Sequence, residues 1–562
     1  MTKRTEQRAP ARPTIVLVLI VAIVALFTPA ALGAPANVIR TGGPSGPGDA
    51  KVAIVAGPSS LAGSTFRVYR GKKLVLRGHL RRGPHASAPW PATFRANLSR
   101  LRAPGRYTVR AAGRKSRPWL VSRRGSTGLI GLILHFFETN RDGEEPALLH
   151  GPSHLHDATV RGGHYGGRHF DLTGGWMDAG DMLHFTQTTA YATMVLEGAA
   201  RIDPGQAAAL REEAGVGVRW LLKAHPAPGL FVTQVGDNRD HQRYFTNPDR
   251  DDASRQPGIG HRLAFHWGSR AGGDLGGKVA AALAMAAVSG TEPDPAPLIE
   301  RAREWFKAGR ASHSATPPLP HAGDFYVVSN WRDSMAAGAA ALYRATGERS
   351  YLKAARRYLA GSSAGETLGY ANVAPLAAAD LCGRLGAPGL GPRAARRQGC
   401  LFLRRNARRT ILYARRNAFG VAAPLTWGTT SSNGAAGAIA AISGLRAGRA
   451  AAAGARDYLL GRNPWGASFV AGFGPRSPRQ ISSWAAVFGF GRPHGAVVGG
   501  PAPRKILRRQ GFSPKGPLQR FNGTGAYEDN RRNYVTSEPA LDYAANSILL
   551  LAAARPHRPP AP

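Results

Sequence analysis

The sequence is poor in cysteine, in acidic residues and in long apolar runs. Only Cys382 and Cys400 occur among 562 residues, which is too few for a cysteine-rich zinc site. The two thiols could form one disulfide or remain separate and buried. Beyond the first 36 residues, no stretch is long and apolar enough to span a membrane.

Acidic residues are outnumbered, with 34 Asp and Glu against 74 Lys and Arg, giving a formal net charge of +40. Such an excess favours a nucleic acid or an anionic surface as partner, or reflects an arginine-rich composition with no partner. Basic residues within positions 3–12 precede an apolar run from Ile15 to Phe27, and small residues follow. Residues 1–36 therefore predict an export signal, cleaved or kept as an anchor, on a secreted or cell-surface protein. Export argues against nucleic acid.

Residues 37–124 predict a small β-sandwich. Short β-type runs alternate there with turn residues at regular spacing, as in Thr65–Tyr69 and Gly105–Arg110. The stretch from Asn37 to Gly125 contains 19 Lys and Arg but one acidic residue, Asp49. We expect this module to hold the protein on an anionic cell-surface polymer or only to brace the larger domain.

Residues 125–556 change to Ala- and Leu-rich helical patterns. An even number of helices of similar length, with long loops between them, predicts a mainly α domain built as a closed ring of helical hairpins. The last residues, 557–562, are expected to be a disordered tail. The expected helices cover residues 127–139, 181–201, 206–224, 273–288, 295–309, 331–345, 349–360, 370–385, 391–415, 431–446, 449–461 and 536–554.

The stretch Gly174–Asp181 places two carboxylates three residues apart behind a glycine turn. Asp178 and Asp181 are expected on the same side of the chain at the N-terminus of a helix from about Met182 to Arg201. There the helix dipole favours the ionised form, which suits a base. Alone, such a pair would be read as helix capping.

A third carboxylate, Glu538, follows Tyr534 and lies beside another expected helix start. Together with Gly174–Asp181, this segment resembles the family 9 glycoside hydrolases, whose signature couples Gly-Gly-Trp-x-Asp-Ala-Gly-Asp to a later Tyr-x-x-Asn-Glu stretch. Further matches run in the same order, at residues 235–241, 461–474 and 495–501. The resemblance covers about residues 37 to 555.

This resemblance implies an (α/α)6 barrel behind an immunoglobulin-like module, and an inverting endo-type hydrolase of β-1,4-linked glucans such as cellulose. Inversion requires a base that activates water and an acid that protonates the leaving oxygen, roughly 6.5–9.5 Å apart. By the family pattern Asp181 is the base, Asp178 helps hold the water and Glu538 is the acid. Tyr534 is a supporting hydrogen-bond donor. His241, at the end of the matched stretch 235–241, is assigned to substrate binding.

Aromatic residues near the long loops are candidates for stacking on sugar rings. Trp176 and Trp427 are the first choices. Trp331 is a further candidate, although it also begins an expected helix and could simply pack there.

The chain also departs from the family pattern. Residues 481–484 stand where Pro-His-His-Arg is usual, so the substrate can differ. Ser537 replaces the Asn before the acid. Lys278 and Ser153 replace residues of the family's calcium and zinc sites, so no metal or other cofactor is expected.

Two other classes of function remain open on the sequence. Five histidines between His154 and His184 lie among aspartates, which could form the site of a metal-dependent hydrolase, although their spacing fits no standard template. The missing His-His-Arg could instead indicate a non-catalytic carbohydrate-binding protein on a decayed hydrolase fold.

Overall fold

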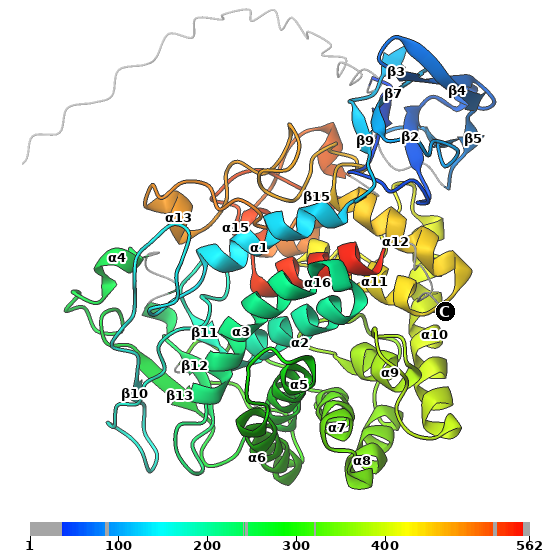
Figure 1. Ribbon diagram of the computed structural model, residues 1–562. Helices are drawn as coiled ribbons and strands as arrows, with labels where there is room; N and C mark the ends of the chain where they lie inside the picture. The colour runs from blue at the N-terminus through cyan, green and yellow to red at the C-terminus, as the bar shows by residue number, and fades with distance from the viewer. Residues whose placement is uncertain are drawn as a thin grey trace, which may run out of the picture.

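The structure is a computed structural model that describes residues 36–84, 89–239, 241, 246–319, 322–520 and 525–554. A small β-domain packs at one edge of a large helical domain (Figure 1). The expected export signal, apart from residue 36, and the expected C-terminal tail lie outside the described residues. No helix in the described ranges has the length and apolarity to cross a membrane.

The β-domain consists of two sheets, with strand orders β1-β2-β6-β5 and β4-β3-β7-β8, and β9 pairs with β7. Alternate side chains such as Phe66, Val68 and Phe94 point between the sheets and form a core of their own. The strands are β1 (Val38–Arg40), β2 (Val52–Gly57), β3 (Thr65–Arg70), β4 (Lys73–His79), β5 (Arg81–Arg82), β6 (Ala92–Asn97), β7 (Gly105–Ala111), β8 (Arg114–Lys115) and β9 (Trp119–Val121).

The helical domain is a ring of six helix pairs. The long helices are α1 (Ile130–Thr139), α2 (Thr186–Ile202), α3 (Ala207–Lys223), α5 (Gly273–Ser289), α6 (Ala296–Ser312), α7 (Arg332–Thr346), α8 (Arg349–Ala360), α9 (Ala374–Cys382), α10 (Arg393–Arg416), α11 (Thr429–Ile442), α12 (Arg446–Leu459) and α16 (Leu541–Ala553). The packed pairs are α2 with α3, α5 with α6, α7 with α8, α9 with α10, α11 with α12, and α16 with α1. The last helix therefore pairs with the first and closes the (α/α)6 ring.

The inner helices are buried all round because their residues are small and apolar. In α5, Gly273 to Ala286 are all buried. A Cβ atom on Gly277 would come within 2.3 Å of the backbone of Ser334 in α7, so glycine lets these two helices approach closely. The outer helices have one apolar stripe and one charged face, as in α8.

Short strands and short helices lie in the connections between the long helices of the ring. A small sheet of order β10-β13-β12-β11 lies beside the start of α2. The short strands are β10 (Thr159–Val160), β11 (His184–Phe185), β12 (Val232–Val235), β13 (Leu263–His266), β14 (Ala502–Pro503) and β15 (Gly525–Ala526). The short helices are α4 (Pro248–Asp251), α13 (Trp484–Val487), α14 (Arg504–Arg509) and α15 (Tyr534–Ser537).

The β-domain is fixed to the ring by buried polar contacts. The guanidinium of Arg456 in α12 lies 2.5 Å from the carboxylate of Asp49, and both side chains are buried. Arg462 donates to the carbonyl of Val52 at 3.2 Å. The module's single carboxylate is thus turned inward and pairs with a cation of the helical domain.

The expected helices agree with the structure along the ring, but two helix starts were wrong. Helix α2 begins at Thr186, so Asp178 and Asp181 precede it on non-helical backbone and are not in its first turn. Glu538 follows the short helix α15 and precedes α16, so it starts no helix. Cys382 and Cys400 form a disulfide between α9 and α10, which resolves the alternative left open by the sequence.

Candidate active site

The two carboxylate-bearing segments lie side by side because backbone hydrogen bonds join them. The amide of Leu541 donates to the carbonyl of Asp178 at 2.9 Å. Residues 482–484 connect the same two segments, since the amide of Ser482 donates to Ser537 at 3.1 Å and that of Trp484 donates to Gly180 at 2.8 Å. Segments far apart in the sequence therefore meet at one end of the ring.

A cavity of about 1210 Å³ opens where they meet. Its described lining contains five carboxyl groups and neither Lys nor Arg, although the chain as a whole is strongly basic. The carboxyl groups belong to Asp178, Asp181, Asp324, Glu538 and Asp542. The described lining of the cavity therefore offers groups that can donate or accept protons, with no Lys or Arg of the same lining beside them.

The two carboxylate oxygens of Asp181 have different surroundings. Its Oδ2 contacts Nδ1 of His241, which also lines the cavity. Its Oδ1 is buried and has no hydrogen-bond partner among the described residues. A buried carboxylate oxygen without a donor is a suitable acceptor for the proton of a bound water.

Asp178 is buried beside Asp181 and has partners on both oxygens. The hydroxyl of Thr188 donates to Oδ1 at 2.5 Å, and the hydroxyl of Tyr326 contacts Oδ2. Burial, together with the neighbouring charge of Asp181, raises the pKa of Asp178 to about 8 against the effect of these hydroxyls. Asp178 therefore retains a proton at neutral pH.

Glu538 lines the same cavity, and its carboxyl lies beside Gly180, which stands between the two aspartates in the sequence. Burial and then the charge of Asp181 raise the pKa of Glu538 to about 8, although His241 and the amide of Gly180 oppose the shift. A Cβ on Gly180 would lie 2.2 Å from the carbonyl oxygen of Ser482 and 3.1 Å from Glu538 Oε1. Glycine at position 180 is thus required for the two segments to approach this closely.

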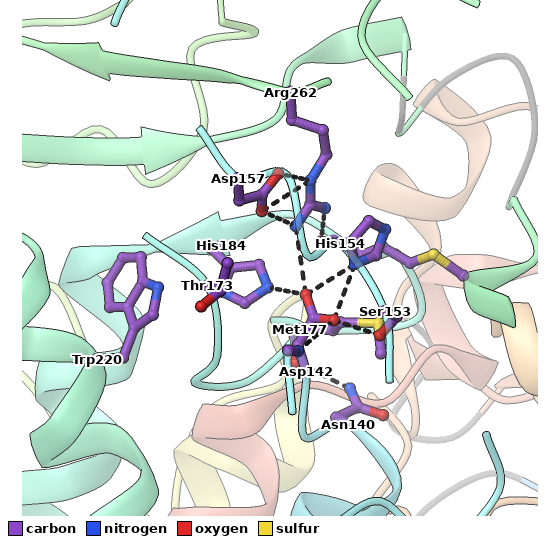
Figure 2. A network of polar contacts seen from close by, with 12 residues as sticks. Asn140, Asp142, Ser153, His154, Asp157, Thr173, Met177, His184, Trp220 and Arg262 are labelled. Carbon is purple, nitrogen blue, oxygen red and sulfur yellow. Dashed lines mark hydrogen bonds and ion pairs between the residues drawn. The ribbon is translucent and has the colours of Figure 1, made fainter. Parts of the chain in front are cut away.

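A buried polar network supports the segment that carries the aspartates (Figure 2). The side-chain amide of Asn140 donates to the carbonyls of Met177 and Ala179 at 2.9 and 3.0 Å. The amide of Asp142 donates to the carbonyl of Gly175 at 3.0 Å. Several backbone groups of this irregular segment are therefore satisfied by residues that follow α1.

The carboxylate of Asp142 is the centre of the network. It accepts from His184 Nε2 at 2.7 Å and lies 2.8 Å from His154 Nδ1 (Figure 2). His154 Nε2 also lies 3.3 Å from Asp251. Burial and Arg262 oppose the charged imidazole, but the charge and hydrogen bond of Asp142 raise the pKa of His154 to about 10. His154 is therefore cationic at neutral pH.

Arg262 completes the network as a second cation. Its guanidinium is fully buried and lies 3.3 Å from Asp142 and within hydrogen-bond distance of Asp157. Another of its nitrogens donates to the carbonyl of Met182 at 2.6 Å. The guanidinium thus pairs with two buried carboxylates and holds the segment just after Asp181.

These residues do not fit a metal ion. The network contains no thiolate, and the guanidinium of Arg262 already supplies positive charge beside Asp142. Within the described part of the chain, no group of three or more His, Cys, Asp or Glu could hold a metal ion. The predicted alternative of a metal site between His154 and His184 is therefore wrong, because these two histidines serve as hydrogen-bond partners of Asp142.

The predicted aromatic residues have three different positions. Trp427 is 41% exposed, lines the cavity and lies 5.8 Å from the ring of Tyr534, which lines it too. Tyr534 donates its hydroxyl to Gln510 at 2.7 Å. Trp331 lines a separate cavity between α6 and α8. Trp176 is fully buried against Phe137, so the expectation that it stacks on a sugar was wrong.

Several cavity residues had no signal in the sequence. Tyr326, Tyr370 and Asp542 line the cavity, and burial raises the pKa of Asp542 to about 6. Tyr326 comes from the connection before α7, and only its contact with Asp178 identifies it. Asp142 and Arg262 were not predicted from the sequence either, because their roles depend on contacts between distant segments.

The charge of His154 predicts a pH-dependent stability. Its folded pKa of about 10 lies above the unfolded value of 6.5, so the stabilisation is complete below pH 6.5 and is lost as the pH rises toward 10. We expect the free energy of unfolding in urea to fall more steeply between pH 6.5 and 10 in the unsubstituted protein than in His154→Gln. His156→Gln, at an exposed histidine, is the control. Equal pH slopes in all three proteins would contradict a cationic His154.

Comparison with known proteins gives the same picture of both domains. The family model "Glycosyl hydrolase family 9" matches residues 128–551, and the model "Cellulase N-terminal ig-like domain" matches residues 46–116. Endoglucanase 5 of Arabidopsis thaliana is 28% identical over 490 residues, covering 74% of this chain and 72% of the relative. Endoglucanase 14 of the same plant is 34% identical over 251 residues, covering 41% of this chain and 47% of that relative.

Among solved structures, a thermostable endoglucanase from Alicyclobacillus acidocaldarius has a TM-score of 0.78 at 22% identity, covering 92% of this chain and 99% of the other. At this identity the likeness shows a shared fold. The family model matches well over half of the sequence. The ring fold and the paired carboxylates agree with this match. The chain belongs to glycosyl hydrolase family 9, and an immunoglobulin-like module precedes its helical domain.

Proposed function

We propose that this glycoside hydrolase is an endo-acting, inverting hydrolase of β-1,4-linked glucans, with Asp181 as base and Glu538 as acid. The observation that carries the proposal is the presence, in one cavity, of a buried Asp181 oxygen with no donor among the described residues and a Glu538 carboxyl with a raised pKa. The names of the similar endoglucanases support the substrate class.

We assign different roles to the three carboxyl groups because their electrostatic surroundings differ. At neutral pH a group with a pKa of about 8 keeps its proton, so Glu538 is ready to protonate the leaving oxygen. The protonated Asp178 stays hydrogen-bonded to Thr188 and Tyr326 and helps to hold the water. Asp181 then accepts a proton from that water as it attacks the sugar from the opposite face.

The first test removes each proton-transfer group without changing its shape. We expect Asp181→Asn and Glu538→Gln each to lower kcat by about 10²–10⁴-fold, because each loses its proton-transfer function. The same pKa predicts that activity falls as the pH rises through about 8. Turnover on a soluble β-1,4-glucan, with a thermal melt of each variant, gives the measurement.

Asp324→Asn is the matched control, since it removes a carboxylate of the same cavity that has no assigned proton transfer. Its loss of activity should be much smaller. Near-normal turnover in Glu538→Gln would reject Glu538 as the acid.

The second test follows the configuration of the product. Hydrolysis of a β-linkage by direct attack of water should first release the α-anomer, which proton NMR distinguishes from the β-anomer before mutarotation. We also expect turnover to be unaffected by a chelator. An initial β-anomer would contradict the role of water as the nucleophile, and sensitivity to the chelator would contradict a metal-independent site.

We also propose that the enzyme acts outside the cell and that its β-domain binds an anionic cell-surface polymer. Strand pairing places Arg77 opposite Arg67, Arg67 opposite Arg110, and Arg110 opposite Lys115. All four side chains are exposed. Like charges directly opposite each other destabilise a sheet, and an anionic partner across this row would relieve the repulsion.

The third test removes part of this row. Arg67→Gln combined with Arg77→Gln and Arg110→Gln should weaken cosedimentation of the full chain with anionic wall material at low salt. The effect should fade as ionic strength passes roughly 0.15 M, where the Debye length is about 8 Å. Binding to insoluble neutral glucan should not change. The control removes three exposed arginines from α10, Arg404, Arg405 and Arg408. Equal losses of cosedimentation in both variants would contradict binding by the β-domain, which would then only brace the helical domain.

A further inference from the structure

A second cavity, of about 720 Å³, lies among helices α6, α7 and α8. Its described lining contains several basic residues and no Asp or Glu. The long cationic side chains are Lys307, Arg310, Arg332 and Arg357, and all four are exposed. We call this cavity the distal basic pocket.

Aromatic rings hold two of these cations in place. The guanidinium carbon of Arg332 lies 4.9 Å from the centre of the Trp331 ring, and that of Arg357 lies 4.9 Å from the centre of the Tyr358 ring. The two rings themselves pack edge to face, with centroids 5.7 Å apart. A guanidinium over a ring keeps its N–H donors at the edge of its plane, where they remain available to an acceptor.

The neighbouring carboxylates do not neutralise the pocket. Glu304 pairs with Arg301 at 2.8 Å, and Glu348 pairs with Arg303. Among the described residues, no salt bridge joins an Asp or Glu to any of the four cations of the pocket. The structure thus leaves four convergent positive charges without a protein anion, which is the arrangement that binds carboxylate or phosphate groups.

Two connections, one before α7 and one after α8, contribute to both the distal basic pocket and the cavity with Asp181 and Glu538, which we call the catalytic cavity. Tyr326 lines the catalytic cavity and Trp331 lines the distal basic pocket, five residues later. Likewise Gly361 lines the distal basic pocket and Thr367 the catalytic cavity. Five residues span at most about 18 Å, so one polysaccharide chain of several sugar units could reach from the catalytic cavity to the distal basic pocket.

The two cavities have opposite charge. The described lining of the catalytic cavity has five carboxyl groups with neither Lys nor Arg, and that of the distal basic pocket has four cations with no Asp or Glu. An acidic sugar would be repelled at the cleaved bond but attracted to the distal basic pocket.

We propose that the distal basic pocket binds anionic groups of a polysaccharide whose neutral β-glucosyl unit occupies the catalytic cavity. The natural substrate is then a β-1,4-glucan that bears acidic groups away from the cleaved bond. This inference rests on the proposed function.

The experiment compares two soluble β-1,4-glucans, one carboxymethylated and one carrying neutral hydroxyethyl groups. At low salt the unsubstituted enzyme should have the lower KM on the carboxymethylated glucan. Arg310→Gln combined with Arg332→Gln and Arg357→Gln should raise that KM at least about threefold, because three exposed ion pairs with the substrate are lost together. The KM on the hydroxyethylated glucan should change much less, and salt near 0.5 M should remove the difference.

The Arg404, Arg405 and Arg408 triple Gln variant removes the same charge from the exposed surface of α10 and is the control. An equal rise in KM in both triple variants would overturn the inference, because the overall charge would then explain the attraction. An equal KM of the unsubstituted enzyme on both glucans would overturn it as well. Absence of hydrolysis on both glucans would instead overturn the proposed function, and with it the inference.

Discussion

The buried carboxylate of Asp142 is the constraint on which the candidate active site depends. The segment with Asp178 and Asp181 has no helix of its own at these positions, so its shape must be imposed by neighbours. Asp142 gathers His154, His184 and Arg262 around itself, and each belongs to a different stretch of the chain. In a low-dielectric interior such a cluster is stable only when every charge is compensated, which leaves it few alternative geometries.

The carboxyl groups around Asp142 differ from those of the large cavity. Around Asp142 each carboxylate pairs with a cation, whereas the described lining of the cavity gathers carboxyl groups without Lys or Arg. Burial, and then the charge of Asp181, raises the pKa values of Asp178 and Glu538. Buried carboxyl groups therefore behave differently in the two places, because those around Asp142 pair with Arg262 or His154, whereas Asp178 and Glu538 lie beside another carboxylate.

The sequence was sufficient for the order of the helices and for the identity of the carboxylates. The helical patterns have a strong period, and the two motifs contain residue types that a packed core would not need. It was insufficient wherever the outcome depended on contacts between distant segments. Trp176 follows the glycine turn as a cavity residue would, yet it packs on Phe137 in the core. Tyr326 stands in a connection with no periodic pattern, so only the folded chain reveals its contact with Asp178.

Closure of the ring by its first and last helices has a consequence for the order of events during synthesis. Asp178 and Asp181 precede α2, whereas Glu538 lies just before α16, the helix that packs on both α1 and α2. Contacts of such large sequence separation form late and slowly, because the loop they close spans nearly the whole domain. With the proposed roles of Asp181 and Glu538, a nascent chain would contain its base long before its acid, and hydrolytic activity would appear only when the ring is complete.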